Sequence, residues 1–293
     1  MASMTIYLCN EVIASRPFRE QCIFARECGY DGIEIAPFTL GEDPTRLTAA
    51  QIADYRAIAE GEGVGVGGLH WLFAAPQGLS ITSRDDTVFG ETCDAGRRLI
   101  DLCAGLGGAY LVHGSPKQRQ LAPGNEAEGR ERARIFFAAM AGSAGDAGLA
   151  YIIEPLARAD TGLINSVDEA LALIDDVGLQ SLKTMVDCYA TASNGEDVAA
   201  LLARWLPRGA ISHVHFNDSN RRGPGQGSID FAAILSTLRA HKYIGTTAAE
   251  PFDYVPDGFS AAARAIGFLR GMEQAIDQAS ILAPGVKAGA SAS

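Results

Sequence analysis

Short apolar runs alternate along the chain with longer segments in which apolar residues recur at helical spacing. The runs lie a few tens of residues apart, at 4–10, 31–37, 65–73, 109–115, 149–156, 182–190, 211–218 and 245–254. Most are apolar nearly throughout, which is typical of parallel strands that are covered on both faces. The pattern therefore predicts eight strands, each followed by a helix.

Two of the intervening segments carry clear helix signals. Over 86–106, five apolar or small residues fall at helical spacing: Val88, Thr92, Ala95, Leu99 and Cys103. Ser166, followed three residues later by Glu169, matches the capping box that begins a helix. Eight strand–helix units predict a parallel sheet closed into a (β/α)8 TIM barrel.

No shift in composition divides the chain, and 293 residues suit a single barrel. We expect one domain over 1–279 and a flexible tail over 280–293, where small residues replace the helical pattern. The stretch GVGVGG at 63–68 matches the Gly-x-Gly-x-x-Gly pattern of nucleotide-binding loops. Because it leads into a strand, whereas such a loop leaves a strand and opens a helix, we expect no nucleotide site there.

Composition and charge narrow the functional classes. The formal net charge of -11 opposes binding to a phosphate backbone, so we expect no nucleic-acid partner. No run of 18 apolar residues occurs and the start of the chain lacks a basic segment before an apolar one, so we expect a cytoplasmic protein without a membrane partner. The six cysteines are scattered and are expected to be buried reduced thiols.

Polar residues gather at the carboxyl ends of the apolar runs. In a closed barrel these ends share one mouth, where catalytic residues lie in this architecture. Four of the five histidines belong to this set, which comprises Asn10, Glu11, Glu34, His70, His113, Glu154, Asp187, His213, His215 and Glu250. Individually, Glu34 could pair with a helix arginine, and His70 or His113 could be a hydrogen-bonded core histidine. Together they predict a site at the mouth, with His70 and His113 contacting the substrate.

Four of these residues come from four consecutive runs. Several unpaired carboxylates in an apolar barrel would cost several kcal/mol each unless a positive charge lies among them. Three carboxylates and one imidazole suit Mn²⁺, Mg²⁺ or Co²⁺. The sequence therefore predicts a divalent metal bound by Glu154, Asp187, His215 and Glu250.

The stretch HVHFND at 213–218 sets two histidines on one face of a strand. His215 lies nearer the mouth and is the expected ligand. His213 lies one layer deeper, so we expect it to support the metal ligands from behind rather than to bind the metal.

The order Glu, Asp, His, Glu at the ends of the fifth to eighth strands resembles the xylose isomerase-like TIM-barrel superfamily of sugar phosphate isomerases and epimerases. The residues stand in the contexts IIEP, MVDCY, HVHFNDSNR and AEPF, and YDGIEI at the second strand is also typical. Within this superfamily the chain is most similar to ketose 3-epimerases of the D-tagatose and D-psicose type. The resemblance covers about 4–275.

The resemblance implies that Glu154, Asp187, His215 and Glu250 bind one metal, with Mn²⁺ expected first, and that Glu154 and Glu250 also act as acid and base. It implies that Arg221 contacts the substrate, and Asp160 stands where the epimerases carry a glutamate. Ala190 is a departure, because the epimerases usually carry a histidine three residues after the sixth-strand aspartate.

The expected activity is proton abstraction next to a carbonyl of a small sugar, through a metal-stabilised enediolate, by a sugar isomerase or epimerase. Alternatives of the same fold are an inosose or 3-dehydroshikimate dehydratase, a hydroxypyruvate isomerase, or a non-catalytic sugar-binding barrel. Whether the substrate is phosphorylated stays open, since Lys117, Arg119, Arg221 or Arg222 could bind a phosphate. Homo-oligomerisation also stays open.

Overall fold

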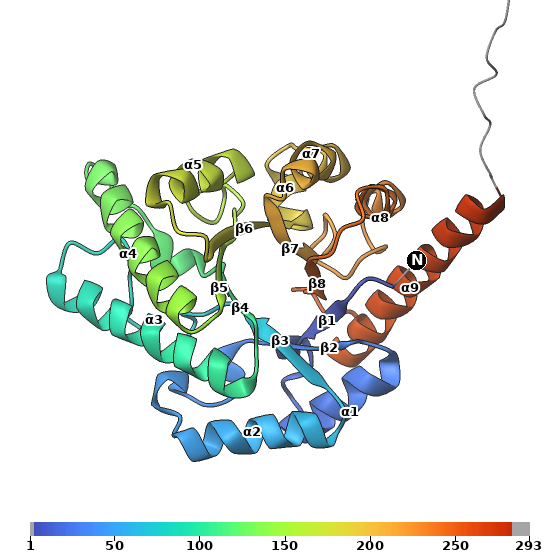
Figure 1. Ribbon diagram of the computed structural model, residues 1–293, viewed down its shortest axis with the longest axis horizontal. Coiled ribbons are helices and arrows are strands. Elements are labelled where there is room, and N and C mark those ends of the chain that lie inside the picture. The colour runs from blue at the N-terminus through green and yellow to red at the C-terminus, as the bar shows by residue number, and fades with distance from the viewer. Residues whose placement is uncertain (1–2, 283–293) are drawn as a thin grey trace, which may run out of the picture.

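The computed structural model describes residues 3–282, and within this range eight parallel strands close into one barrel in chain order (Figure 1). The strands are β1 (Ile6–Cys9), β2 (Gly32–Ile35), β3 (Gly65–Leu69), β4 (Tyr110–His113), β5 (Ala150–Ile153), β6 (Leu182–Asp187), β7 (Ile211–Phe216) and β8 (Thr246–Ala249). Each lies inside one of the eight apolar runs. The predicted (β/α)8 barrel is confirmed.

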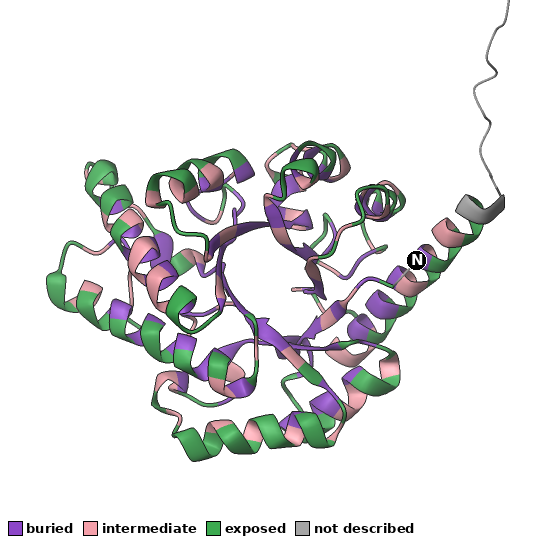
Figure 2. Cartoon of the chain, viewed as in Figure 1, coloured by how far each residue is buried: buried purple, intermediate pink, exposed green. Residues whose placement is uncertain are grey.

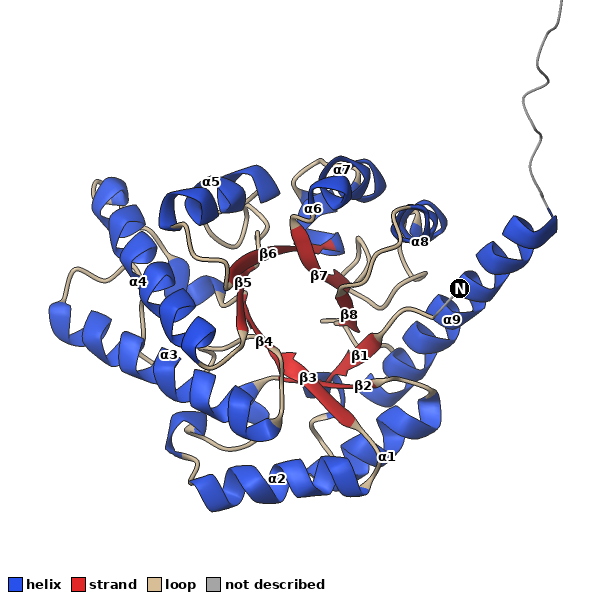
Figure 3. Cartoon of the chain, in the orientation of Figure 1, coloured by secondary structure: helices blue, strands red, loops and turns tan. Residues whose placement is uncertain are grey.

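Helices follow the strands and surround the barrel (Figure 3). They are α1 (Phe18–Cys28), α2 (Ala49–Gly61), α3 (Asp86–Leu106), α4 (Glu126–Asp146), α5 (Val167–Val177), α6 (Cys188–Ser193), α7 (Val198–Trp205), α8 (Phe231–Ala240) and α9 (Gly258–Leu282). None of the helices in this described part of the chain combines the length and apolar character needed to cross a membrane.

Three sequence predictions concern helix ends. Helix α3 covers 86–106 as predicted. Ser166 caps α5 by accepting a hydrogen bond from the backbone N–H of Glu169. The Glu169 side chain, however, accepts from the backbone N–H of Asn165 rather than of Ser166, so the expected capping box is only half formed. Helix α9 continues to Leu282, three residues into the predicted tail, and the rest of that tail lies outside the described residues.

The barrel strands are buried on both sides, whereas the helices expose their outer faces (Figure 2). Outward side chains of the strands pack against the helices in one large apolar core. Inside the barrel a smaller cluster contains Tyr110, Val112, Ile152 and Met185, with Tyr7 against it. Side chains therefore alternate between these two layers along each strand.

The glycine-rich stretch at 63–68 has a packing role in this barrel. Gly67 and Gly68 belong to β3, and a Cβ atom at Gly67 would lie 2.5 Å from the ring of Tyr7. A Cβ atom at Gly68 would lie 2.3 Å from the carbonyl oxygen of Tyr110 and 2.6 Å from its ring. The absent side chains thus make room for the two tyrosines inside the barrel.

Strand register brings the functional residues to one level. Asp187 of β6 is paired with His215 of β7, and His215 is paired with Ala248 of β8. Glu250 follows Ala248 by two residues, so period-two alternation points the side chains of all three toward the barrel axis.

Gly68→Ala should destabilise the fold, because the added methyl group would collide with the Tyr110 backbone. Overpacking of this kind costs about 1–3 kcal/mol. Gly90→Ala in α3 is the matched control: its Cβ would meet no atom of the described residues within 4 Å, and removing a helix-interior glycine stabilises by about 0.5–1 kcal/mol. Calorimetric melting temperatures should therefore shift in opposite directions, and equal shifts would contradict the packing role.

Candidate functional site

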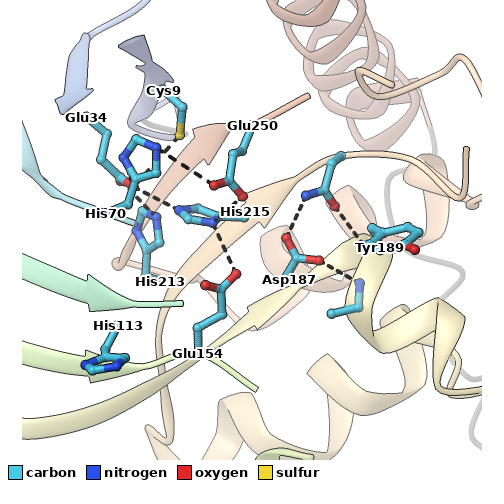
Figure 4. Close-up of polar contacts among 12 residues, drawn as sticks. Cys9, Glu34, His70, His113, Glu154, Asp187, Tyr189, His213, His215 and Glu250 are labelled. Carbon is cyan, nitrogen blue, oxygen red and sulfur yellow. Dashed lines mark hydrogen bonds and ion pairs between the residues drawn. The ribbon is translucent and has the colours of Figure 1, made fainter. Parts of the chain in front are cut away.

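Four residues meet at the carboxyl-end mouth of the barrel, one from the end of each of β5 to β8. Glu154, Asp187, His215 and Glu250 each offer a ligand atom, and these atoms all lie within 4.8 Å of one another. All four side chains are buried. Figure 4 shows His215 between the carboxylates of Glu154 and Glu250, with Asp187 to one side. The structure thus brings together the set that the sequence predicts as metal ligands.

The His215 imidazole is held in one orientation. Its Nε2 lies 2.9 Å from Glu34 Oε1 and is placed to donate to this carboxylate, so Nδ1 faces the cluster. Nδ1 is 2.8 Å from Glu250 Oε2 and 3.6 Å from Glu154 Oε1. Nδ1 is therefore the atom that is placed to bind a cation.

A divalent ion fits this donor set. His215 Nδ1 and Glu250 Oε2 are buried and, among the described residues, have no partner with hydrogen-bond geometry, although they approach as an ion pair. Buried polar atoms without such a partner are costly. A cation among them would satisfy both atoms together with oxygens of Glu154 and Asp187.

The Asp187 carboxylate is fixed from two sides. Its Oδ1 accepts a hydrogen bond of 2.6 Å from the backbone N–H of Ala190, so Asp187 also caps helix α6. Its Oδ2 accepts one of 2.6 Å from the Asn217 side chain. Asn217 Oδ1 in turn accepts from the backbone N–H of Tyr189. Asn217 is thus a site residue to which the sequence pattern assigned no role.

The space for Glu154 depends on Gly114, the residue that follows β4. A Cβ atom at Gly114 would lie 1.6 Å from Glu154 Oε2, so a side chain there would displace the carboxylate. The main chain at Glu154 is held by Arg119, which is completely buried and donates to the Glu154 carbonyl at 2.7 Å. Arg119 thus holds the main chain of Glu154, and the missing side chain at Gly114 leaves room for its carboxylate.

Crowding of buried carboxylates changes their proton affinity. Burial, followed by the charge of Glu154, raises the pKa of Asp187 to about 6. Burial also raises the pKa of Glu250 to about 8, although the nearby His215 acts in the opposite direction. Before a cation binds, Glu250 therefore holds a proton near neutral pH, and a divalent ion would compete with that proton.

Glu34 forms the centre of a second layer beneath the cluster. It is fully buried, and its Oε2 accepts a hydrogen bond of 2.5 Å from the Tyr110 hydroxyl. His213 Nε2 lies 3.1 Å from the same oxygen, and His213 Nδ1 lies 2.7 Å from the hydroxyl oxygen of Thr246. Burial alone would raise the pKa of Glu34, but His213 and His215 hold it well below its usual range.

The partners of Glu34 differ from the helix arginine that the sequence suggested, whereas His213 lies where it was expected. Glu34 pairs with histidines and a tyrosine inside the barrel instead of with a helix arginine. His213 lies behind His215, in contact with the carboxylate that orients it, and is not in the four-residue cluster. The alternation of Glu34 with Ile33 and Ile35 already indicated that its side chain faces the barrel axis.

The predictions for His113 and His70 require correction. His113 faces outward, where it packs against Phe73, Phe136 and Phe137 and hydrogen bonds to Tyr151. It follows Val112, which faces inward, so strand alternation directs His113 away from the mouth. In Figure 4 it lies apart from the cluster.

His70 does face the barrel axis, but it pairs with Glu11 at 2.8 Å and lies 3.8 Å from Glu250. Among the described residues, neither His70 nor His113 is part of the cavity wall. Burial acts to lower the pKa of His70, but Glu11 and the neighbouring glutamates raise it to about 9. His70 therefore compensates buried negative charge instead of facing the cavity.

The wall of the cavity next to the cluster includes Asp160 and Arg221, the two loop residues that were expected to contact the substrate. Glu154, Asp187 and Glu250 also line this cavity. The Arg221 guanidinium stacks against two further lining residues, with its Cζ 5.2 Å from the ring centre of Tyr189 and 5.1 Å from that of Phe252. Its backbone is left-handed, with φ of 64°.

Asp218 organises the loop that carries Arg221. Its carboxylate accepts hydrogen bonds from the backbone N–H groups of Ser219, Gln226, Gly227 and Ile229. A Cβ atom at Gly227 would lie 2.4 Å from Asp218 Oδ1, so this loop closes tightly around the carboxylate. The last two residues of HVHFND therefore serve Asp187 and Arg221, respectively.

Two of the four candidate phosphate ligands have other partners. The buried Arg119 donates to the backbone carbonyls of His113, Glu154, Leu163 and Ile164, and burial lowers its pKa to about 10. It is therefore a structural clamp and not a phosphate ligand. Arg222 forms an exposed ion pair of 2.9 Å with Asp253. Arg221 is the candidate that lines the cavity.

Tyr110→Phe should destabilise the protein by about 1.5–3 kcal/mol, because it removes a hydrogen bond to the buried Glu34 carboxylate. Tyr30→Phe is the matched control, since Tyr30 is also buried but donates to the neutral carbonyl of Ala262, a bond worth about 0.5–1.5 kcal/mol. Denaturant unfolding of both variants gives the comparison. A loss for Tyr110→Phe no larger than that for Tyr30→Phe would contradict an ionised Glu34.

The chain is similar to several known proteins. The chain is 26% identical over 250 residues to a probable ketose 3-epimerase of Synechocystis sp., covering 84% of this chain and 83% of the relative. It is 28% identical over 230 residues to an L-ribulose 3-epimerase of Mesorhizobium japonicum, covering 78% and 73%.

A solved structure of L-ribulose 3-epimerase superimposes with a TM-score of 0.82 at 22% identity, covering 97% of this chain and all of the other. The family model described as xylose isomerase-like TIM barrel matches residues 22–272. The chain therefore belongs to the xylose isomerase-like TIM-barrel family.

Proposed function

We propose that the protein is a divalent-metal-dependent sugar epimerase, with a ketose 3-epimerase activity on a small-molecule sugar. The observation that carries this proposal is the pair Glu154 and Glu250, which approach the same imidazole of His215 from β5 and β8. The epimerase names of its relatives support the reaction class.

A divalent ion held by Glu154, Asp187, His215 and Glu250, for which Mn²⁺ is our first choice, would stabilise the negative charge that develops on substrate oxygens during proton removal. The protein fixes its own part of this chemistry in advance. Glu34 keeps the Nδ1 lone pair of His215 directed at the cluster, while Asn217 and the N-terminus of α6 hold Asp187.

Epimerisation needs one group to remove a proton from one face of a carbon and another to return a proton to the opposite face. Glu154 and Glu250 border the cavity from two strands and can serve these two roles. Burial, together with the charge of Glu154, raises the pKa of Glu250 to about 8, which suits Glu250 to hold and deliver a proton near neutral pH. Arg221 and Asp160, at the cavity wall, are placed to orient substrate oxygens.

A lyase of the same fold would begin with the same proton abstraction and then expel a β-hydroxyl. A non-catalytic barrel would bind the sugar without exchange. Products distinguish the three: an epimer, an unsaturated compound, or unchanged sugar. A screen of Mn²⁺-loaded protein against ketoses, inososes and dehydroshikimate tests them together.

We predict that His215→Ala loses the metal and the activity, because Nδ1 is a ligand. His213→Ala should keep stoichiometric metal and lose about 10–100-fold in affinity or rate, as supporting residues do. Elemental analysis measures the metal content of both variants. For the wild type, dialysis against a chelator should lower the melting temperature, and added Mn²⁺ should restore it. Equal metal loss in both variants, or a melting curve that the chelator leaves unchanged, would argue against the assignment.

Glu250→Gln should lower turnover by at least about 10²–10⁴, because the amide cannot accept the proton. In D₂O, the wild type should place deuterium on the carbon next to the substrate carbonyl as product forms. Glu91→Gln, exposed on α3, is the control and should react like the wild type. Product without deuterium, or full activity of Glu250→Gln, would refute the two-carboxylate mechanism.

A further inference from the structure

Four apolar residues of the cavity wall come from the segments that follow β4, β5 and β6. We call this set the aliphatic flank, and it consists of Pro116, Leu156, Ala157 and Ala190. Leu156, Ala157 and Ala190 are buried, with 8%, 1% and 4% of their surface exposed, so the flank is a fixed part of the interior. It borders the carboxylates of Glu154 and Asp187 in the same cavity.

Backbone groups of the flank are already engaged within the chain. The Leu156 carbonyl accepts hydrogen bonds from the side chains of Asn165 and Asn194, and the Leu156 N–H donates to Ile164. The Ala157 carbonyl accepts from the backbone N–H groups of Asp160 and Thr161. Both carbonyls thus use the two acceptor positions that a carbonyl oxygen has.

Backbone groups of the other two flank residues are also engaged. The Ala190 N–H donates to Asp187 Oδ1, and its carbonyl accepts from the Asn194 N–H and the Ser193 hydroxyl. Pro116 has no N–H, and its carbonyl accepts from the Gln120 side chain. The carbonyls of Leu156, Ala157 and Ala190 therefore have no acceptor position left for a substrate hydroxyl.

Polar side chains of the cavity lie outside the flank. Beyond Glu154, Asp187 and Glu250, they come from Trp71, Asp160, Tyr189 and Arg221. Tyr189 and Arg221 are stacked on each other, and Arg221 also stacks on Phe252. The cavity thus combines these charged and polar side chains with the aliphatic surface of the flank.

We propose that the flank receives a substrate carbon that bears no hydroxyl, so that the preferred substrate of this enzyme is a terminally deoxygenated ketose, with a methyl group against Leu156, Ala157 and Ala190. This inference rests on the proposed function and narrows its substrate class. A methyl group gains contact with the flank, whereas a hydroxymethyl group buries an unpaired hydroxyl there.

Binding of non-reacting polyols tests the flank independently of turnover. Mannitol and 1-deoxymannitol differ by one hydroxyl and have no carbonyl, so neither can be epimerised. Calorimetric titration of the Mn²⁺-loaded protein should give a dissociation constant about 10–100-fold lower for 1-deoxymannitol, the range in which an apolar pocket discriminates against an added hydroxyl. In parallel, kcat/KM for 1-deoxyfructose or 6-deoxyfructose should exceed that for fructose.

Ala190→Ser adds a hydrogen-bonding group to the flank and should reduce the preference for 1-deoxymannitol. Ala192→Ser, in the same helix α6 but not part of the cavity wall among the described residues, is the matched control and should keep the wild-type ratio. Equal or tighter binding of mannitol, an unchanged ratio in Ala190→Ser, or no binding of either polyol would overturn the proposal. If the protein still prefers 1-deoxymannitol but epimerises no ketose, the proposed function is refuted and the binding preference of the flank is not.

Discussion

Buried negative charge at the mouth of the barrel is the constraint around which this site is built. Glu34, Glu154, Asp187 and Glu250 lie within an apolar barrel, and each is almost completely buried. Isolated carboxylates cannot remain ionised in such surroundings without compensation. Imidazoles, a phenol, an amide and backbone N–H groups provide part of it, and a divalent cation among the ligands would provide the rest.

Compensation is organised in two layers. In the lower layer, Glu34 receives the Tyr110 hydroxyl and faces His213 and His215. In the upper layer, Glu154, Asp187 and Glu250 surround the remaining nitrogen of His215. Because one imidazole joins both layers, the position of Glu34 decides which nitrogen is presented to a ligand. Chemistry at the mouth thus depends on a residue that does not reach the cavity.

Loops after the strands are fixed by buried polar groups of their own. Arg119 gathers four backbone carbonyls of the β4 and β5 loops, and Asp218 gathers four backbone N–H groups of the loop after β7. The charged groups of Arg119 and Asp218 therefore bind loop backbone rather than substrate and fix the conformation of these loops. The cavity walls, including the aliphatic flank, are consequently formed before any substrate enters.

The sequence by itself determined the barrel and the four-residue cluster, because eight apolar runs, the period-two direction of strand side chains and the shared mouth of parallel strands are local or topological rules. The same rules placed His213 behind His215. The prediction for His113 was wrong because its neighbour Val112 faces inward, so His113 faces the outer layer. Arg119 is buried, and the residues around it in the sequence give no sign of this. Only the tertiary structure decided that Glu34 orients His215, that Asn217 holds Asp187 and that the carbonyls of three flank residues are already occupied. These are contacts between residues far apart in the chain, which depend on strand register and loop closure rather than on local pattern.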